Sequence, residues 1–176
     1  MTDMPQESEI LERLNGAPTV RGFFIVAVDI FHLAVDGLMQ RIFQKDNFAV
    51  QSVVGPLLQA SGPLGDLSVR LKLLFGLGVI ANDVYHDIET MVKLKHQLNN
   101  DGHDYDFTTA QLIEPILKMH LVKRMGMMPD TFAPFDESDL ALCQLQQQRQ
   151  QRVVQSSLSL VIVEICNALN QDSPFR

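Results

Sequence analysis

Two pairs of a carboxylate and an imidazole are the residues of this chain whose types and spacing could support chemistry. Asp29 precedes His32 by three residues, and Asp83 precedes His86 by the same spacing. Residues three apart share one face of a helix, so each pair could offer an oxygen and a nitrogen ligand to a metal ion. Di-metal sites in helical bundles also need carboxylates from two further helices, and the sequence has few candidates. We therefore expect salt bridges to Arg or Lys and predict no metal and no cofactor. The alternative, a metal-dependent helical-bundle enzyme or sensor, predicts stoichiometric metal after purification.

Other patterns of catalytic residues are incomplete. The serines lack the flanking glycines of a nucleophile elbow, and Gly76-Leu77-Gly78 lacks the strand and helix that a phosphate-binding loop joins. Cys143 and Cys166 have no metal-ligand spacing, and on one helix they would lie beyond disulfide reach. We predict that the protein is not an enzyme and that its thiols stay reduced in the cytoplasm.

The overall charge argues against direct reading of DNA. The chain has 14 Lys and Arg against 21 Asp and Glu, a net charge of −7, so its surface repels phosphate on average. The segment 66–98 could be scanned as a helix-turn-helix, but Asp83, Asp87 and Glu89 of its second helix would then face the DNA phosphates. A direct DNA-binding repressor stays as an alternative, and it predicts sequence-specific promoter binding with a steep salt dependence.

The elements that position these residues are predicted to be helices, because apolar residues recur at helical spacing along the chain. The predicted elements are a short N-terminal helix at 6–14, a long helix from Thr19 to about 44, a central hairpin at 66–98 and a long C-terminal helix at about 138–169. With 46% hydrophobic residues, the 176-residue chain can bury a substantial core without disulfides. We predict an all-α fold: a single all-helical regulatory domain over 1–176, a bundle without a recognisable DNA-binding motif.

Local signals predict several helix ends. Asp66 is the expected N-cap of the first hairpin helix, Gly76 or Gly78 its end, and Asn82 the N-cap of the second.

Prolines are expected to interrupt two other helices. A short helix at 47–58 should break before Pro56. A capping box at Thr108–Gln111 should start a helix that is kinked at Pro115 and ends near Arg124.

The run from 23 to 39 is apolar enough to be mistaken for a membrane span. Asp29 and Asp36 lie inside it, and each would cost roughly 2.5 to 3.5 kcal/mol at the centre of a bilayer. We expect a central core helix and no membrane contact. The N-terminus is acidic and lacks the pattern of a secretory signal, which also favours a cytoplasmic location.

Arg70 and Lys72 lie among apolar residues of the hairpin. A charge in such a place needs a partner, because burying an unpaired charge is costly. We expect both to pair with acidic residues of the bundle, such as Asp29, Asp36 or Asp87, rather than to face a ligand.

The sequence Gly-Pro-Leu-Gly-Asp-Leu-Ser-Val-Arg-Leu-Lys at 62–72, followed by Gly-Leu-Gly-Val-Ile at 76–80, resembles the bacterial mannitol operon repressor family. The blocks 13–16, 19–21 and 98–108 fall in the order that this family shows. The resemblance implies an all-helical transcriptional regulator, a repressor of a mannitol uptake and utilisation operon, with no enzymatic activity and no recognised DNA-binding fold.

Two segments are alternative candidates for contact with a partner, and core packing is the other use considered for the first. The crossover at 125–137 is rich in Met and Phe, which suit an adaptable contact surface. The polar half of the last helix, 144–152, is expected to project, because a helix over 138–169 is about 50 Å long. The contact candidates are Met127, Met128, Phe132 and Phe135 in the first segment and Arg149 and Arg152 in the second. We expect indirect repression through a component of the sugar phosphotransferase system or the transcription machinery, with a homo-oligomer as a further possibility.

Overall fold

The computed structural model describes residues 6–43, 48–59, 61–126 and 139–171, and every regular element among them is a helix. In chain order the helices are α1 (Glu7–Asn15), α2 (Val20–Ile42), α3 (Phe48–Leu58), α4 (Leu67–Gly76), α5 (Asn82–Asn100), α6 (Ala110–Lys118), α7 (His120–Met125) and α8 (Leu140–Leu169). The predicted all-α fold class is confirmed.

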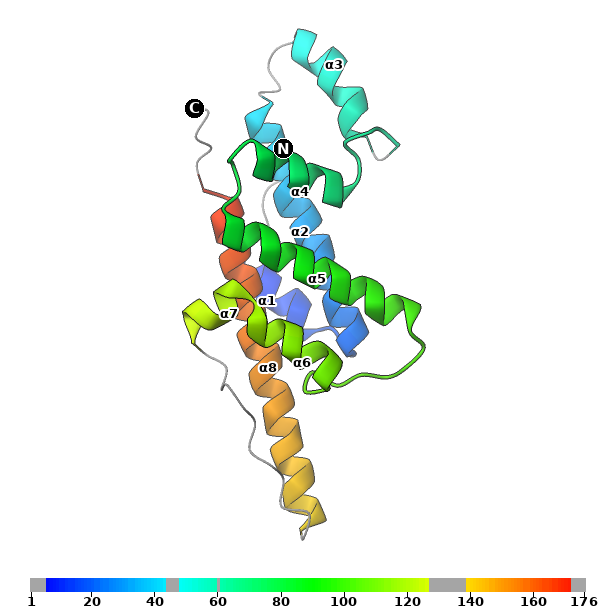
Figure 1. Ribbon diagram of the computed structural model, residues 1–176, viewed down its shortest axis with the longest axis vertical. Helices are drawn as coiled ribbons and strands as arrows, with labels where there is room; N and C mark the ends of the chain where they lie inside the picture. Colours follow the sequence, from blue (N-terminus) through cyan, green and yellow to red (C-terminus); the bar gives the residue numbers. More distant parts are fainter. Residues whose placement is uncertain (1–5, 44–47, 60, 127–138, 172–176) are drawn as a thin grey trace.

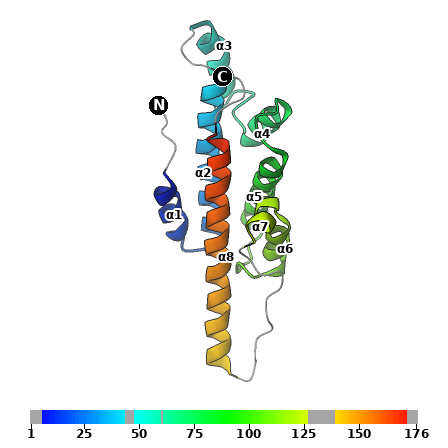
Figure 2. The same ribbon diagram turned by 90° about the vertical axis from the view of Figure 1, so that its left-hand side faces the viewer.

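The helices form three layers, with α2 and α8 in the middle (Figures 1 and 2). Helix α1 packs against both of them on one side. Helices α4 to α7 cover the other side, and among these α5 packs against α2, α4, α6, α7 and α8. Helix α3 stands apart at one end of the molecule (Figure 1).

The core lies around α2, as the sequence predicts. Thr19 is the N-cap, and its hydroxyl accepts a hydrogen bond of 2.9 Å from the Gly22 N–H. The buried side chains of α2 are Phe23, Phe24, Ala27, Val28, Ile30, Phe31, Ala34, Val35, Leu38 and Met39. Together with the buried faces of α1 and of α4 to α8, they form one hydrophobic cluster. Burial of this kind is the main favourable term in folding.

In the α4–α5 hairpin, the sequence predicts both ends of α4 correctly but not the start of α5. The Asp66 carboxylate caps α4 by accepting from the Ser68 N–H at 2.8 Å. Gly78, with φ of 74°, then closes α4 in a left-handed turn. Its N–H donates to the Phe75 carbonyl, and the Val79 N–H donates to the Leu74 carbonyl, each at 3.0 Å, which is the Schellman pattern. Asn82 is not the N-cap of α5.

The N-cap of α5 is Ala81, whose extended backbone places Asn82 inside the helix. The N-cap of α5 therefore has no side-chain hydrogen bond. The prediction was wrong because the cap position follows from where the chain turns after Gly78, and the polar side chain one residue later does not decide it.

A buried carboxylate on α5 starts α7. The Asp87 carboxylate is only 1% exposed and accepts from the backbone N–H groups of His120 and Leu121, each at 2.8 Å. In a continuous helix those two N–H groups would bond to carbonyls of the preceding turn. The chain instead becomes extended at Met119 (ψ 138°) and begins a new helix. The predicted kink at Pro115 is therefore wrong, because the break lies four residues later, where Asp87 supplies the partner.

Two other details of the sequence analysis need correction. The N-cap of α6 is Thr109, so the predicted capping box at Thr108 does not form. The Thr109 hydroxyl accepts from the Asp106 N–H at 3.0 Å and makes no capping hydrogen bond to the helix. Helix α3 also continues through Pro56 to Leu58. Only two residues follow this proline in the helix, so the missing N–H removes a hydrogen bond from its last turn alone.

The last helix is a single long one, as predicted, and its N-terminal part extends beyond the rest of the bundle (Figures 1 and 2). We call residues 140–152 the arm. Near its base, the Gln151 side chain accepts from the Phe107 N–H at 2.7 Å and donates to the Thr108 hydroxyl at 2.9 Å. From Val154 onward the inward face of α8 is buried.

Two helices of the described residues, α2 and α8, are long and apolar enough to cross a membrane by length and composition alone. In α2, 61% of the apolar stretch is buried inside the protein, and in α8 the share is 56%. Packing within the bundle accounts for both runs, which agrees with the predicted core role of α2.

Replacing Phe31 with Ala is expected to lower the free energy of unfolding by about 3 to 5 kcal/mol, because the ring is fully buried and its removal leaves a cavity. Denaturant titration followed by circular dichroism measures this loss. Phe48→Ala is a matched control, since Phe48 is 83% exposed and its loss should change stability by less than about 0.5 kcal/mol. Equal losses in the two variants would contradict the core assignment.

Replacing Asp87 with Ala is expected to cost about 2 to 4 kcal/mol, because two backbone N–H groups lose their acceptor and each such loss costs roughly 1 to 3 kcal/mol. The same titration tests it. The control is Asp83→Ala, one turn earlier on α5, where a half-exposed ion pair should contribute less than about 1 kcal/mol. A change of that small size at Asp87 would show that its capping role is unimportant.

Candidate functional site

A polar concavity opens where α2 is accessible between α1 and α4. Its volume is about 550 Å³, within the roughly 300 to 1,000 Å³ range of small-molecule sites. The residues that line it are Arg13 of α1, Asp29, His32, Leu33 and Asp36 of α2, Gly65, and Arg70 of α4. Five of these seven side chains are ionisable, so the concavity gathers charged groups from three helices.

Arg70 forms the fixed wall of the concavity. It is only 7% exposed, and its guanidinium donates to the backbone carbonyls of Leu64 at 2.5 Å and Leu58 at 2.6 Å. It also pairs with the Asp36 carboxylate at 3.4 Å. The predicted pairing of Arg70 with an acidic residue of the bundle is confirmed. For Lys72 the prediction was wrong: its side chain is exposed and forms no hydrogen bond or ion pair with a described residue.

His32 contributes an imidazole that stays uncharged at neutral pH. Partial burial lowers its pKa below the usual 6.5, and the nearby positive charge of Arg70 lowers it further, against the opposing effect of Asp29. Its ring can therefore both donate and accept a hydrogen bond.

Two other lining groups have free hydrogen-bonding capacity. Among the described residues, neither the Arg13 guanidinium nor the Asp29 carboxylate forms a hydrogen bond or an ion pair within the structure. Together with His32 they give the concavity polar groups that are not engaged as Arg70 is.

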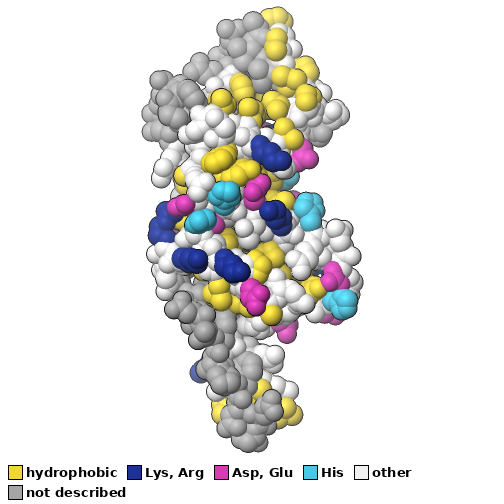
Figure 3. All heavy atoms as spheres, in the orientation of Figure 1, with side chains coloured by type: hydrophobic (Ala, Val, Ile, Leu, Met, Phe, Trp, Pro, Cys, Tyr) yellow, Lys and Arg dark blue, Asp and Glu magenta, His cyan; other side chains and the backbone are white. Residues whose placement is uncertain are grey.

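The second carboxylate–imidazole pair lies on a different surface, beside α7. The Asp83 carboxylate pairs with the Arg124 guanidinium at 2.7 Å and lies 3.8 Å from Nδ1 of His120. The His86 ring contacts those of Tyr85 and His120, with centroids 5.2 and 6.2 Å apart. A band of His, Lys, Arg, Asp and Glu side chains crosses this face (Figure 3).

The four metal candidates are therefore not brought together. Asp29 and His32 face the concavity, whereas Asp83 and His86 lie beside α7. Within the described ranges, no group of three or more His, Cys, Asp or Glu is arranged to hold a metal ion. The sequence analysis missed His120 as a neighbour of Asp83, because 37 residues separate the two and no local sequence pattern predicts the contact.

The acidic residues that would face DNA in a helix-turn-helix have structural partners instead. Asp83 pairs with Arg124, Asp87 caps α7, and Glu89 accepts from the Tyr85 hydroxyl at 2.8 Å. Helix α5 packs against five other helices, and its exposed face carries no partner-free Asp83, Asp87 or Glu89 that the helix-turn-helix reading would need to explain.

Arg21 joins the start of α2 to the end of α5. Its guanidinium donates to the carbonyls of Leu98 and Asp101, each at 2.9 Å, and to that of His103 at 3.3 Å. These residues belong to sequence blocks that carried the family resemblance, and they surround a small hollow of about 90 Å³.

The loop beside this hollow holds one strongly acidic carboxyl. Hydrogen bonds from the Tyr105 hydroxyl and then from His103 lower the pKa of Asp101 to about 2, and the same contact raises the pKa of His103. The hydrogen bonds stay within the loop, so the carboxylate orders it rather than awaiting a ligand.

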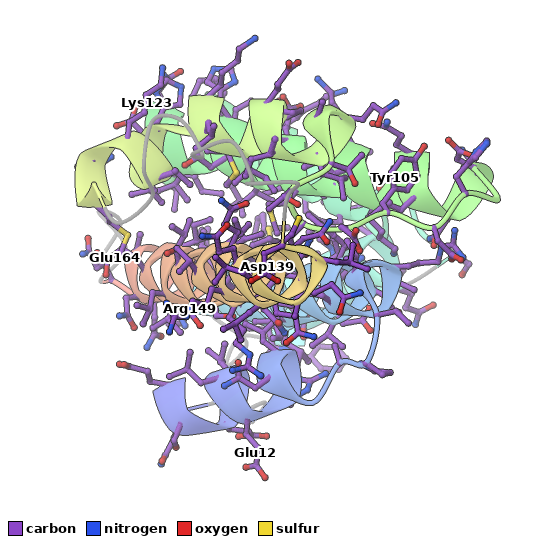
Figure 4. All side chains as sticks on the ribbon, turned by 90° about the horizontal axis from the view of Figure 1, so that it is seen from below. Glu12, Tyr105, Lys123, Asp139, Arg149 and Glu164 are labelled. Carbon is purple, nitrogen blue, oxygen red and sulfur yellow. The ribbon has the colours of Figure 1, made fainter. Side chains whose placement is uncertain are left out.

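The arm carries the partner-contact candidates that the structure describes. Arg149 and Arg152 are exposed on it, and Figure 4 labels Arg149, with Glu164 farther along the same helix. Exposed leucines accompany them, with Leu140 73%, Leu142 43% and Leu145 50% exposed. The other candidates, Met127, Met128, Phe132 and Phe135, lie outside the described residues.

Comparison with known proteins gives three informative relatives. The chain is 41% identical over 170 residues to the mannitol operon repressor of Escherichia coli (strain K12), covering 97% of this chain and 85% of that protein. The X-ray structure of the MtlR-HPr complex from Escherichia coli matches with a TM-score of 0.87 and 41% identity, over 94% of this chain and 98% of that one. Fumarase E of Escherichia coli (strain K12) is 26% identical over 137 residues, 77% of this chain and 81% of that protein.

The family model described as mannitol repressor matches residues 6–170, nearly the whole chain. This agrees with the resemblance carried by the blocks at 62–72 and 76–80 and with the all-helical structure. The chain therefore belongs to the mannitol repressor family.

Proposed function

We propose that this protein represses a mannitol uptake and utilisation operon and that it does so through a protein partner, with the chain acting as one regulatory unit. The observation that carries the proposal is the 41% identity, over almost the full chain, to an Escherichia coli repressor whose family member is solved in complex with HPr. We infer that HPr, a protein of the phosphotransferase system, is the partner here as well.

The structure supports an indirect mechanism on electrostatic grounds. A specific DNA complex needs several phosphates neutralised by clustered basic side chains. The net charge is −7, and three of the basic residues, Arg21, Arg41 and Arg70, donate to backbone carbonyls of the bundle. The helix that could be scanned as a DNA reader carries acidic residues in its first turns, Asp83, Asp87 and Glu89. These features favour contact with protein over contact with DNA.

We propose that the arm supplies the contact with HPr. It projects from the bundle, which makes it accessible from several sides (Figures 1 and 2). Its exposed Leu142 and Leu145 offer apolar area, and Arg149 and Arg152 offer charge. Protein interfaces commonly combine an apolar centre with Arg at or near it.

We propose further that the protein acts in the cytoplasm and is not an enzyme. Cys143 and Cys166 are free, and burial raises the pKa of the Cys166 thiol to about 12, so this thiol stays protonated and unreactive. The chain has a relative named for mannitol repression at 41% identity, and the one named for an enzymatic activity is more distant, at 26%.

A second candidate function is the hydration of an unsaturated dicarboxylate, favoured by the relationship to Fumarase E. The concavity contains groups that such chemistry uses: an uncharged His32 for proton transfer and the Arg13 guanidinium for a carboxylate. This reading requires that the pure protein binds fumarate and converts it to malate.

The arm assignment predicts that Arg149→Glu combined with Arg152→Glu raises the Kd for HPr at least tenfold, because the reversed charges oppose those of the wild-type contact. Leu145→Glu should weaken binding as well by placing a charge in the apolar part. Calorimetric titration of HPr into the pure protein measures both. Exposed substitutions of this kind leave folding intact.

The matched control is Glu164→Lys, an exposed charge reversal on the same helix outside the arm. It should bind HPr like the wild type. Wild-type affinity in all variants would contradict the arm assignment, and no binding by the wild type would contradict the choice of partner.

Indirect repression also predicts that the pure protein does not select mannitol promoter DNA over random competitor at about 150 mM salt, because an acidic protein of net charge −7 neutralises few phosphates and so gains little from counterion release. A gel shift at nanomolar protein tests this. Selective binding under these conditions would replace the proposal with direct repression.

A further inference from the structure

The concavity between α1, α2 and α4 has a balanced set of charges. Two arginines, Arg13 and Arg70, face two aspartates, Asp29 and Asp36, and the fifth ionisable group, His32, is uncharged at neutral pH. An anion in this space would meet two carboxylates, and a cation would meet two guanidinium groups. The formal charge of the lining is zero, which favours an uncharged ligand.

The lining offers both donors and acceptors. Arg13 can only donate, Asp29 can only accept, and the His32 ring does both. A ligand that satisfies all three must offer both acceptors and donors, and a set of hydroxyl groups supplies both. Leu33, which is 36% exposed, adds an apolar surface on which the carbon chain of such a molecule can lie.

The site is built on a fixed support. Arg70 is held by three contacts, to the Leu64 and Leu58 carbonyls and to Asp36, and Asp36 also accepts from the Gln40 side chain at 3.1 Å. This network fixes one wall and leaves Arg13, Asp29 and His32 as the groups with capacity for a ligand. A rigid wall facing a few free polar groups is the usual arrangement of a small-molecule site.

The blocks of sequence that identify the family meet at this concavity. Arg13 comes from the block at 13–16, and Gly65 and Arg70 come from the block at 62–72. Folding brings these distant blocks to one surface, although Arg13 contributes nothing to the hydrophobic core.

From these observations we propose that the concavity binds a small, uncharged polyhydroxylated molecule, with Arg13, Asp29 and His32 as the groups that contact its hydroxyls. The choice of a hexitol among such molecules rests on the proposed function in mannitol regulation. Through this site the regulator binds the sugar alcohol directly, and the site is separate from the proposed HPr contact on the arm.

The test is calorimetric titration of mannitol into the full-length protein at pH 7.5, with parallel titrations of glucitol, mannitol 1-phosphate and fumarate. We expect mannitol to bind with a Kd of about 1 mM or tighter, as suits a small polar ligand in an open site. The two anions should bind at least tenfold more weakly, because a lining with no net positive charge does not offset the cost of removing an anion from water. Glucitol, which differs at one hydroxyl, shows how closely the site reads the ligand.

Arg13→Ala and Asp29→Ala should each weaken mannitol binding at least tenfold. Their matched control is Glu12→Ala, on the outer face of α1, where the side chain points away from the bundle (Figure 4). The control should bind mannitol like the wild type. All three variants should keep the wild-type affinity for HPr, so a failure of this site is distinguishable from a failure of the proposed function.

Three results would overturn the inference. The first is no mannitol binding at 10 mM ligand, about ten times the expected Kd. The second is preferred binding of an anion, with malate formed from fumarate pointing to the second candidate function. The third is unchanged mannitol affinity in both Arg13→Ala and Asp29→Ala, which would place any binding elsewhere.

Discussion

Several helices of this bundle end next to another helix. The backbone N–H and C=O groups at a helix end have no partner within the helix and need one elsewhere. Side chains from neighbouring helices provide them. Asp87 of α5 caps the start of α7, Arg21 of α2 caps the end of α5, and Arg70 of α4 caps the end of α3. Arg41, at the end of α2, donates to the Leu169 carbonyl at the end of α8 at 2.8 Å. These contacts between helices satisfy the start of α7 and the ends of α3, α5 and α8.

This constraint also decides which polar residues remain for function. Asp83 and Asp87, which by sequence could bind a metal or face DNA, are engaged with Arg124 and with the start of α7. Three arginines serve helix ends and therefore do not form a basic surface. Among the described residues, the concavity around Asp29 and the arm around Arg149 hold polar groups that do not serve helix ends. The use of charged residues at helix ends therefore limits which of them are available on the described surface.

The sequence predicted what local patterns control and missed what distant contacts control. The α2 core, the N-cap at Asp66 and the single long α8 follow from periodicity and capping chemistry that a short window contains. The break at Met119 does not, because its cause, Asp87, lies 33 residues before the His120 N–H that it accepts from. For the candidate site, the sequence supplied Asp29 and His32 but not Arg13 as their neighbour, since the contact between α1 and α2 leaves no local signal. Arg70 was assigned a structural partner correctly, and the same contact makes it a wall of the site.

The residues that hold the bundle together are different from those that line the concavity. The cluster around Phe31 and the caps at helix ends hold the bundle together, and none of them depends on Arg13, Asp29 or His32. Substitutions at those three positions therefore change what the concavity recognises at little cost in stability, because exposed, unpaired side chains contribute little to folding. The chain is similar both to a protein named as a repressor, at 41% identity, and to one named as an enzyme, at 26%. Function in such a fold must be argued from the lining of the site, where a zero net charge favours a polyol and a net positive charge would favour a dicarboxylate.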